Sequence, residues 1–153
     1  MRTVLARGIG IATLAVTMAG LASCGAPQQI AVDHAWVRLS AVEANPAAAY
    51  FTLHGGATDA TLIGVSTDGA AKAEMHETMK AGQSMTRMEP VETVQLPAHA
   101  DVSFKPGGRH VMLFGVKPGI KPGGTMTLTF AFADGHRVEQ AADVIAAGAA
   151  APE

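Results

Sequence analysis

The sequence predicts an all-β protein, and more narrowly a β-sandwich with Greek-key connections. Short stretches of alternating apolar and polar residues, the period-2 pattern of strands, recur along the chain. Gly, Pro and Asp-Gly turns separate them about every eight to twelve residues. No long stretch combines apolar residues at helical spacing with a capping residue in front of it. We therefore expect about seven to nine short strands in one domain.

The first predicted strand spans residues 30–39, and its alternation places Val32, His34 and Trp36 on one face. The other strands show the same alternation and are bounded by turn residues. The predicted strands are residues 30–39, 47–53, 60–66, 71–77, 91–96, 101–105, 110–116, 124–132 and 136–144.

The N-terminus has the pattern of an export signal. Arg2 and Arg7 precede an apolar run that is too short for a membrane span of about 20 residues, and no acidic residue occurs there. The run ends in Leu-Ala-Ser-Cys, where Cys24 resembles the lipid-modified first residue of a bacterial lipoprotein. An ordinary signal peptide with an incidental cysteine is the alternative. We predict a lipoprotein signal at 1–23, a tether at 24–29, a β-sandwich at 30–145 and a flexible tail at 146–153.

Charge and cysteine content limit the partners and the chemistry. Removal of residues 1–23 leaves nine basic and 13 acidic residues, a formal charge of −4. Such a domain lacks the basic surface that neutralises phosphates, so nucleic acid is excluded as a partner. The single cysteine of the chain allows no internal disulfide. Packing must therefore stabilise the domain, and any soft-metal site must use thioether and imidazole groups.

Possible soft-metal ligands are concentrated between Met75 and Met112, a segment with five of the eight methionines and three of the six histidines. His110 and Met112 are two apart in a predicted strand, so their side chains leave the same face. Of the adjacent Met75 and His76 only one can face a shared site, and we assign His76 to the site and Met75 to the core. A lone methionine or histidine is more often a packing or half-buried polar residue, so clustering alone leaves that alternative open.

Three more methionines, Met79, Met85 and Met88, lie in a segment rich in Gly, Lys, Gln and Ser that we interpret as a loop. Three apolar side chains are unusual in such a loop if packing is their only role. Imidazole and thioether ligands are neutral and soft, which favours Cu(I) over Zn(II). A blue-copper electron carrier would need a cysteine thiolate within the domain, and this domain has none.

Several segments resemble the periplasmic copper chaperone family PCuAC. They are AWVR at 35–38, AAAYFTL at 47–53, AEMHET at 73–78, MEPV at 88–91 and PGGRHVML at 106–113. The resemblance covers about residues 30–145 and implies a cupredoxin-like, immunoglobulin-like sandwich that binds one Cu(I) per chain. The family motif is a histidine, ten residues, a methionine, about 21 residues and then His-x-Met. It implies His76, Met88, His110 and Met112 as the metal ligands.

One inserted residue distinguishes this sequence from the motif, because eleven residues lie between His76 and Met88. Met85 is therefore an alternative loop ligand, although the Glu-Pro-Val after Met88 keeps the family pattern. The C-terminal tail has no His or Met, so we expect one copper site only. The resemblance implies a periplasmic carrier that delivers copper to the copper site of cytochrome c oxidase or to an assembly factor. We expect this carrier to be a monomer, tethered through Cys24.

Two other functions remain possible from the sequence. A metal-free sandwich module for adhesion or assembly in the envelope would need none of these ligands. A zinc-dependent hydrolase would need a positioned carboxylate base, which we do not find, so an enzyme is disfavoured. Glu74 and Glu77 flank His76, and we interpret both as solvated strand residues. The other histidines are scattered along the sequence, and we expect structural or surface roles for His34, His54, His99 and His136.

Overall fold

The computed structural model describes residues 28–81 and 85–152. The predicted export signal and the lipobox at Cys24 lie outside these residues. The described residues form ten strands and no helix, which confirms the all-β prediction. This part of the chain contains no helix that could span a membrane.

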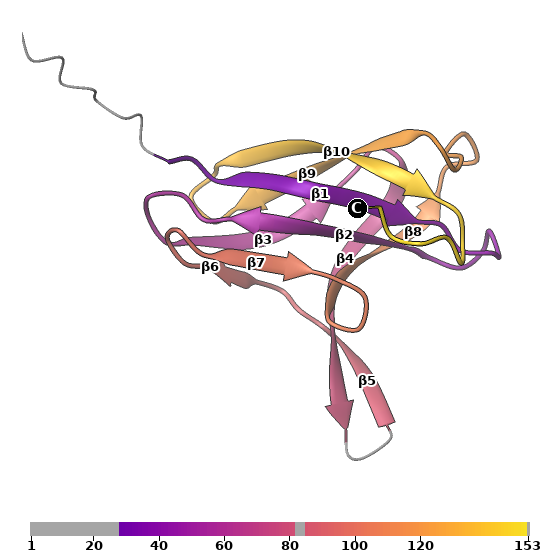
Figure 1. The fold of residues 1–153 in the computed structure, drawn as a ribbon, viewed down its shortest axis with the longest axis horizontal. Helices are drawn as coiled ribbons and strands as arrows, with labels where there is room; N and C mark the ends of the chain where they lie inside the picture. Colours follow the sequence, from indigo (N-terminus) through magenta and orange to yellow (C-terminus); the bar gives the residue numbers. More distant parts are fainter. Residues whose placement is uncertain (1–27, 82–84, 153) are drawn as a thin grey trace, which may run out of the picture.

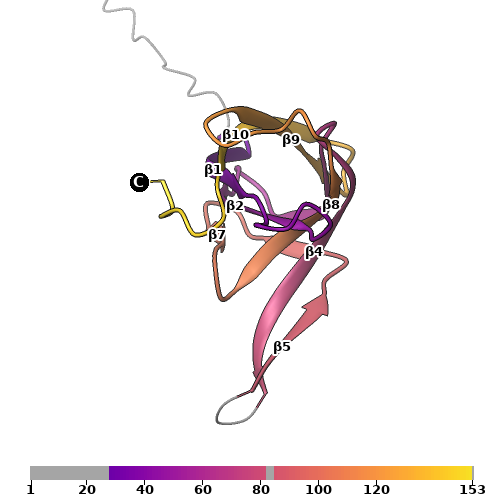
Figure 2. The same ribbon diagram turned by 90° about the vertical axis from the view of Figure 1, so that its right-hand side faces the viewer.

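The ten strands form one strongly curved sheet around an apolar core (Figure 1 and Figure 2). They are β1 (Ala31–Arg38), β2 (Ala47–His54), β3 (Ala60–Ser66), β4 (Ala70–Ala81), β5 (Met85–Pro90), β6 (Val94–Leu96), β7 (Asp101–Phe104), β8 (Arg109–Val116), β9 (Thr125–Phe132) and β10 (Arg137–Ile145). Their order across the sheet is β5-β4-β8-β2-β1-β10-β9-β3-β6, and β7 also pairs with β2. Strands β1 and β10 are parallel, whereas β2 is antiparallel to its neighbours β1, β7 and β8.

The aromatic centre of the core is built on β2. The Phe51 ring stacks on Phe104 at a centroid distance of 4.3 Å and meets the edge of Phe130 at 4.7 Å. Phe130 and Leu53 are fully buried. Burial of each such side chain contributes about 1.5–3 kcal/mol, so packing supplies stability without any disulfide.

A β-bulge in β1 changes which residues face the core. Asp33 and Trp36 each pair with a residue of β2, and between these two pairs β1 contains one more residue than β2. Val32 therefore packs in the core, whereas Trp36 lies outside it, 4.3 Å from the ring of Tyr50. The prediction that Val32, His34 and Trp36 share a face is wrong, because the extra residue reverses the alternation. His34, within the bulge, has a φ of +46°, which a non-glycine residue rarely adopts.

The segment from Met79 to Met88, predicted to be a loop, is part of a β-hairpin. Strand β4 runs four residues beyond its predicted end at residue 77, and β5 is a tenth strand that the sequence analysis missed. The two strands pair continuously from His76 with Pro90 to Ala81 with Met85. The hairpin projects from the body of the protein in both views (Figure 1 and Figure 2). Because it is paired, each methionine in it has a defined face.

Both ends of the described chain contact the sheet. Gln28, within the predicted tether, accepts a hydrogen bond from the Ala57 backbone N–H at 2.9 Å. Its side-chain amide donates to the Gly55 carbonyl at 3.2 Å. Ala149 lies beyond the end of β10, and its carbonyl accepts a hydrogen bond from Nη2 of Arg38 at 3.0 Å.

Candidate metal site

His76 in β4 and His110 in β8 are directly opposite each other in an antiparallel pair. Residues opposite each other in such a pair project from the same face of the sheet. The two imidazole rings have centroids 6.0 Å apart and planes inclined by 25°. The strand pairing therefore brings together two imidazoles that are far apart in the sequence.

The two predicted thioether ligands lie on the same face as this histidine pair. Met112 is two residues beyond His110 in β8, and a two-residue step preserves the face. Met88 in β5 is opposite Thr78, which is two residues beyond His76 in β4. The four predicted ligands thus come from three adjacent strands and project from one face of the sheet.

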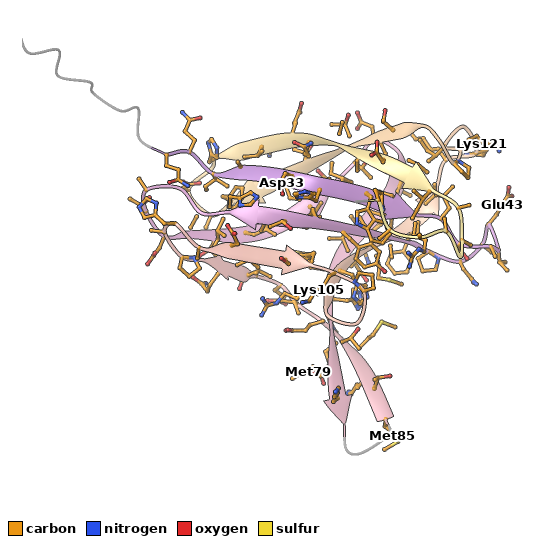
Figure 3. All side chains as sticks on the ribbon, viewed as in Figure 1. Asp33, Glu43, Met79, Met85, Lys105 and Lys121 are labelled. Atoms are coloured by element: carbon orange, nitrogen blue, oxygen red, sulfur yellow. The ribbon has the colours of Figure 1, made fainter. Side chains whose placement is uncertain are left out.

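The same pairing separates Met88 from its alternative, Met85. Met85 is opposite Ala81, and Met79 is opposite Arg87, so both methionines project from the other face of the hairpin. Figure 3 labels both on the projecting hairpin, where their side chains are 70% and 51% exposed. The structure places Met88, and not Met85, on the face of the two histidines.

Met75 lies on the core face of β4, as the sequence predicted. It is opposite the fully buried Val111 of β8 and is itself only 6% exposed. Leu113 is likewise fully buried on this side of β8. An apolar layer therefore supports the strands beneath the candidate site without any contribution from a metal.

His110 presents a single free ring nitrogen. Its side chain is 6% exposed, and Nδ1 lies 3.0 Å from the carbonyl oxygen of Gly108. A carbonyl can only accept, so Nδ1–H donates, and in the neutral ring Nε2 is then the nitrogen that carries the lone pair. Such a bond fixes the tautomer and orientation of a metal-binding histidine. The ring of Tyr50 packs nearby at a centroid distance of 6.4 Å, and burial raises the pKa of its hydroxyl, which stays neutral.

Glu74 is a site residue that the sequence reasoning missed. Its Oε2 lies 3.2 Å from Nε2 of His76, and it also forms an ion pair with Lys72. Lys72, and then His76, hold the pKa of the Glu74 carboxyl below its ordinary value. Glu74 is opposite Met112 in the pairing. The signal available in the sequence was its two-residue spacing from His76, which places both side chains on one face.

The arrangement offers two imidazoles and two thioethers, bordered by one carboxylate. Soft thioether sulfur is matched to monovalent copper and poorly matched to Zn(II). Within residues 28–81 and 85–152, no three His, Cys, Asp or Glu side chains are already grouped as a metal centre.

Sequence comparison relates this chain to proteins named as lipoproteins. The family model described as "Putative lipoprotein LpqE-like" matches residues 30–144. The chain is 29% identical over 135 residues to "Putative lipoprotein Lxx21020" of Leifsonia xyli, covering 87% of this chain and 81% of that protein. It is also 33% identical over 89 residues to an uncharacterized protein of Rickettsia prowazekii, covering 57% of this chain and 49% of that protein.

Structural comparison relates the fold to PCuAC domains. The copper-bound PCuAC domain from PmoF2 has a TM-score of 0.63 at 24% identity, covering 80% of this chain and 97% of that one. The Cu(I) form of DR1885 from Deinococcus radiodurans has a TM-score of 0.57 at 26% identity, covering 82% of this chain and 83% of that one. These matches confirm the cupredoxin-like fold and the predicted resemblance to the PCuAC family.

Proposed function

Since this chain belongs to the LpqE-like lipoprotein family, we propose that it is a metallochaperone that binds one Cu(I) and passes it to a partner protein. The proposed ligands are His76, Met88, His110 and Met112. The observation that carries this proposal is the pairing of β5, β4 and β8, which puts both imidazoles and both thioethers on one face. The Cu(I) form of DR1885, which shares the fold, supports the choice of metal.

The ligands differ in how firmly they are held, and this difference suits a carrier. His110 is buried and its Nδ1 is hydrogen bonded, whereas Met88 is 57% exposed on the projecting hairpin. A soft ligand of a partner can therefore replace the Met88 thioether while His110 and Met112 still hold the ion. At His76, copper has to displace the Glu74 carboxylate from Nε2 or use Nδ1 instead. Ligand exchange of this kind transfers copper without any catalytic step, and the proposed carrier is not an enzyme.

The proposed location is the cell envelope, with a lipid on Cys24. The family and the Leifsonia xyli protein are both named as lipoproteins. A Cys24→Ser variant should be released from the membrane or remain unprocessed, as fractionation and mass spectrometry of the N-terminus would show. Wild-type protein recovered wholly in the soluble periplasm with an unmodified N-terminus would exclude the lipid anchor.

The decisive experiment is metal stoichiometry on the purified mature domain, which we expect to be a monomer. Under anaerobic conditions it should take up one equivalent of Cu(I) with no visible absorption band. The His110→Ala variant should lose this binding, and His136→Ala, at an exposed position in the β9–β10 turn, should retain it. No metal uptake would favour the interaction module, and tight Zn(II) binding would favour the hydrolase.

The acceptor that we propose is the copper site of cytochrome c oxidase. Cu(I)-loaded protein should transfer its copper to a soluble oxidase domain that carries this site, even in the presence of a competing Cu(I) chelator. Loaded Met79→Ala provides a matched control, because this exposed methionine lies on the other face of the hairpin. Transfer no faster than release to the chelator alone would exclude direct delivery.

A further inference from the structure

A second cluster of side chains, remote from the candidate copper site, joins β1 and β2. Asp33 Oδ1 lies 2.7 Å from Nδ1 of His34, and its Oδ2 lies 3.0 Å from Nε2 of His54. One carboxylate thus contacts two imidazoles that are 20 residues apart in the sequence. No pattern in the sequence connects these two histidines, for which separate structural or surface roles were expected.

The bulge in β1 makes this cluster possible. In a regular strand, the adjacent Asp33 and His34 would project from opposite faces. The extra residue and the φ of +46° at His34 let the imidazole reach the neighbouring carboxylate instead. A non-glycine residue in this conformation is strained, and such residues are concentrated at functional sites. The strained residue here carries a metal-binding side chain.

Asp101 completes the cluster from a third strand. It is opposite His54 in the β2–β7 pair, and its Oδ1 lies 2.7 Å from Nδ1 of that histidine. A carboxylate on Nδ1 favours the tautomer in which Nε2 can bind a metal, as in carboxylate–histidine–zinc arrangements. Two carboxylates, those of Asp33 and Asp101, therefore face the two ring nitrogens of His54.

We propose that Asp33, His34 and His54 form a second metal site, for a divalent cation such as Cu(II) or Zn(II), with Asp101 orienting His54. Two imidazoles and a carboxylate are a donor set that both ions accept, whereas Cu(I) prefers the softer thioethers. Two aspartates offset the charge of a dication, while the four ligands of the Cu(I) site are neutral. The two sites thus select different oxidation states by their charge.

The site is accessible and forms by a local movement. The side chains of His34 and Asp33 are 70% and 46% exposed, so both can rotate. Among the residues that the structure describes, these side chains are not grouped as a preformed metal centre, so the carboxylate and the imidazoles have to rotate around the ion to bind it. Along β2, His54 is six positions from Ala48, the partner of Met112, roughly 20 Å at about 3.3 Å per residue. Binding at one site need not disturb the other.

Titration calorimetry with Cu(II) or Zn(II), together with electron paramagnetic resonance of the Cu(II) form, tests this proposal. The background is His110→Ala, which lacks a proposed Cu(I) ligand. We expect one equivalent of divalent ion there, with nitrogen hyperfine coupling in the Cu(II) spectrum. Asp33→Asn, His34→Ala and His54→Gln should each weaken binding at least tenfold, and His136→Ala should not.

The possible results separate the two sites. Loss of the divalent ion in His110→Ala itself would place it at the first site and overturn the proposal. Unchanged affinity in both Asp33→Asn and His34→Ala would also overturn it. Circular dichroism of each variant verifies folding. Failure of Cu(I) binding in the wild type, with the divalent site intact, would contradict only the proposed carrier function.

Discussion

Replacing Met88 by alanine tests whether strand pairing selects the third copper ligand. Met88 is diagonal to His76 across the β4–β5 pair, a Cα separation of roughly 7–8 Å that a long side chain can span. Met85 is three residues earlier and projects from the other face. We expect Met88→Ala to weaken Cu(I) binding by more than tenfold, over about 1.4 kcal/mol. Met85→Ala should leave the affinity within about twofold, or ~0.4 kcal/mol.

The magnitude follows from the composition of the site. Its four proposed ligands are neutral, so no charge among them compensates for a lost donor. Met88 is 57% exposed, and its removal uncovers little buried surface. The free energy of unfolding of the apo protein should therefore change by no more than about 0.5 kcal/mol. Competition with a chromophoric Cu(I) chelator under anaerobic conditions measures the affinity, and urea denaturation measures the stability.

The two variants together can refute the reasoning. Full affinity in Met88→Ala with loss in Met85→Ala would mean that the hairpin changes its register when copper binds. Equal loss of Cu(I) affinity in both variants would mean that the exposed hairpin contributes to binding as a whole. The face from which a methionine projects would then not determine whether it is a ligand. A large loss of stability in Met88→Ala would show that its side chain packs more than its exposure indicates.

Replacement of either His110 or Met112 by alanine should weaken Cu(I) binding more than tenfold, whereas Met79→Ala should change it little. Competition with a Cu(I) chelator measures the affinity of all three variants. Unchanged affinity in His110→Ala would exclude the proposed site. Because its ring is fully buried, Phe130→Ala should lower the unfolding free energy by about 3–5 kcal/mol, and a urea midpoint close to wild type would contradict the assigned core. The pKa of His54 is raised above its ordinary value of 6.5 by two carboxylates, so its stabilising contribution is complete below that pH and disappears as the pH rises through the folded-state pKa. The stability difference between wild type and His54→Gln should shrink accordingly from acid to alkaline pH, and a constant difference would refute the assignment.

Local properties of the sequence were sufficient for the fold class and for the donor set that we propose for the copper site. Alternation is a short-range pattern, and the strands predicted at 47–53 and 60–66 match β2 and β3 within one residue. The buried position of Met75 also followed from alternation. Ligand type depends only on composition: a domain with methionines and histidines but no cysteine offers neutral soft donors.

The tertiary structure alone decided the faces of the hairpin methionines and of the residues after the β1 bulge, and which distant residues meet. A polar segment rich in Gly and Ser gave no sign of β5, yet pairing with β4 separates Met88 from Met85. One extra residue in β1 moved Trp36 to the outer face and brought His34 and His54 to the same carboxylate. Register and bulges depend on hydrogen bonds and burial between strands far apart in the chain, and a shift of one residue exchanges the two faces. No pattern within a single strand contains that information.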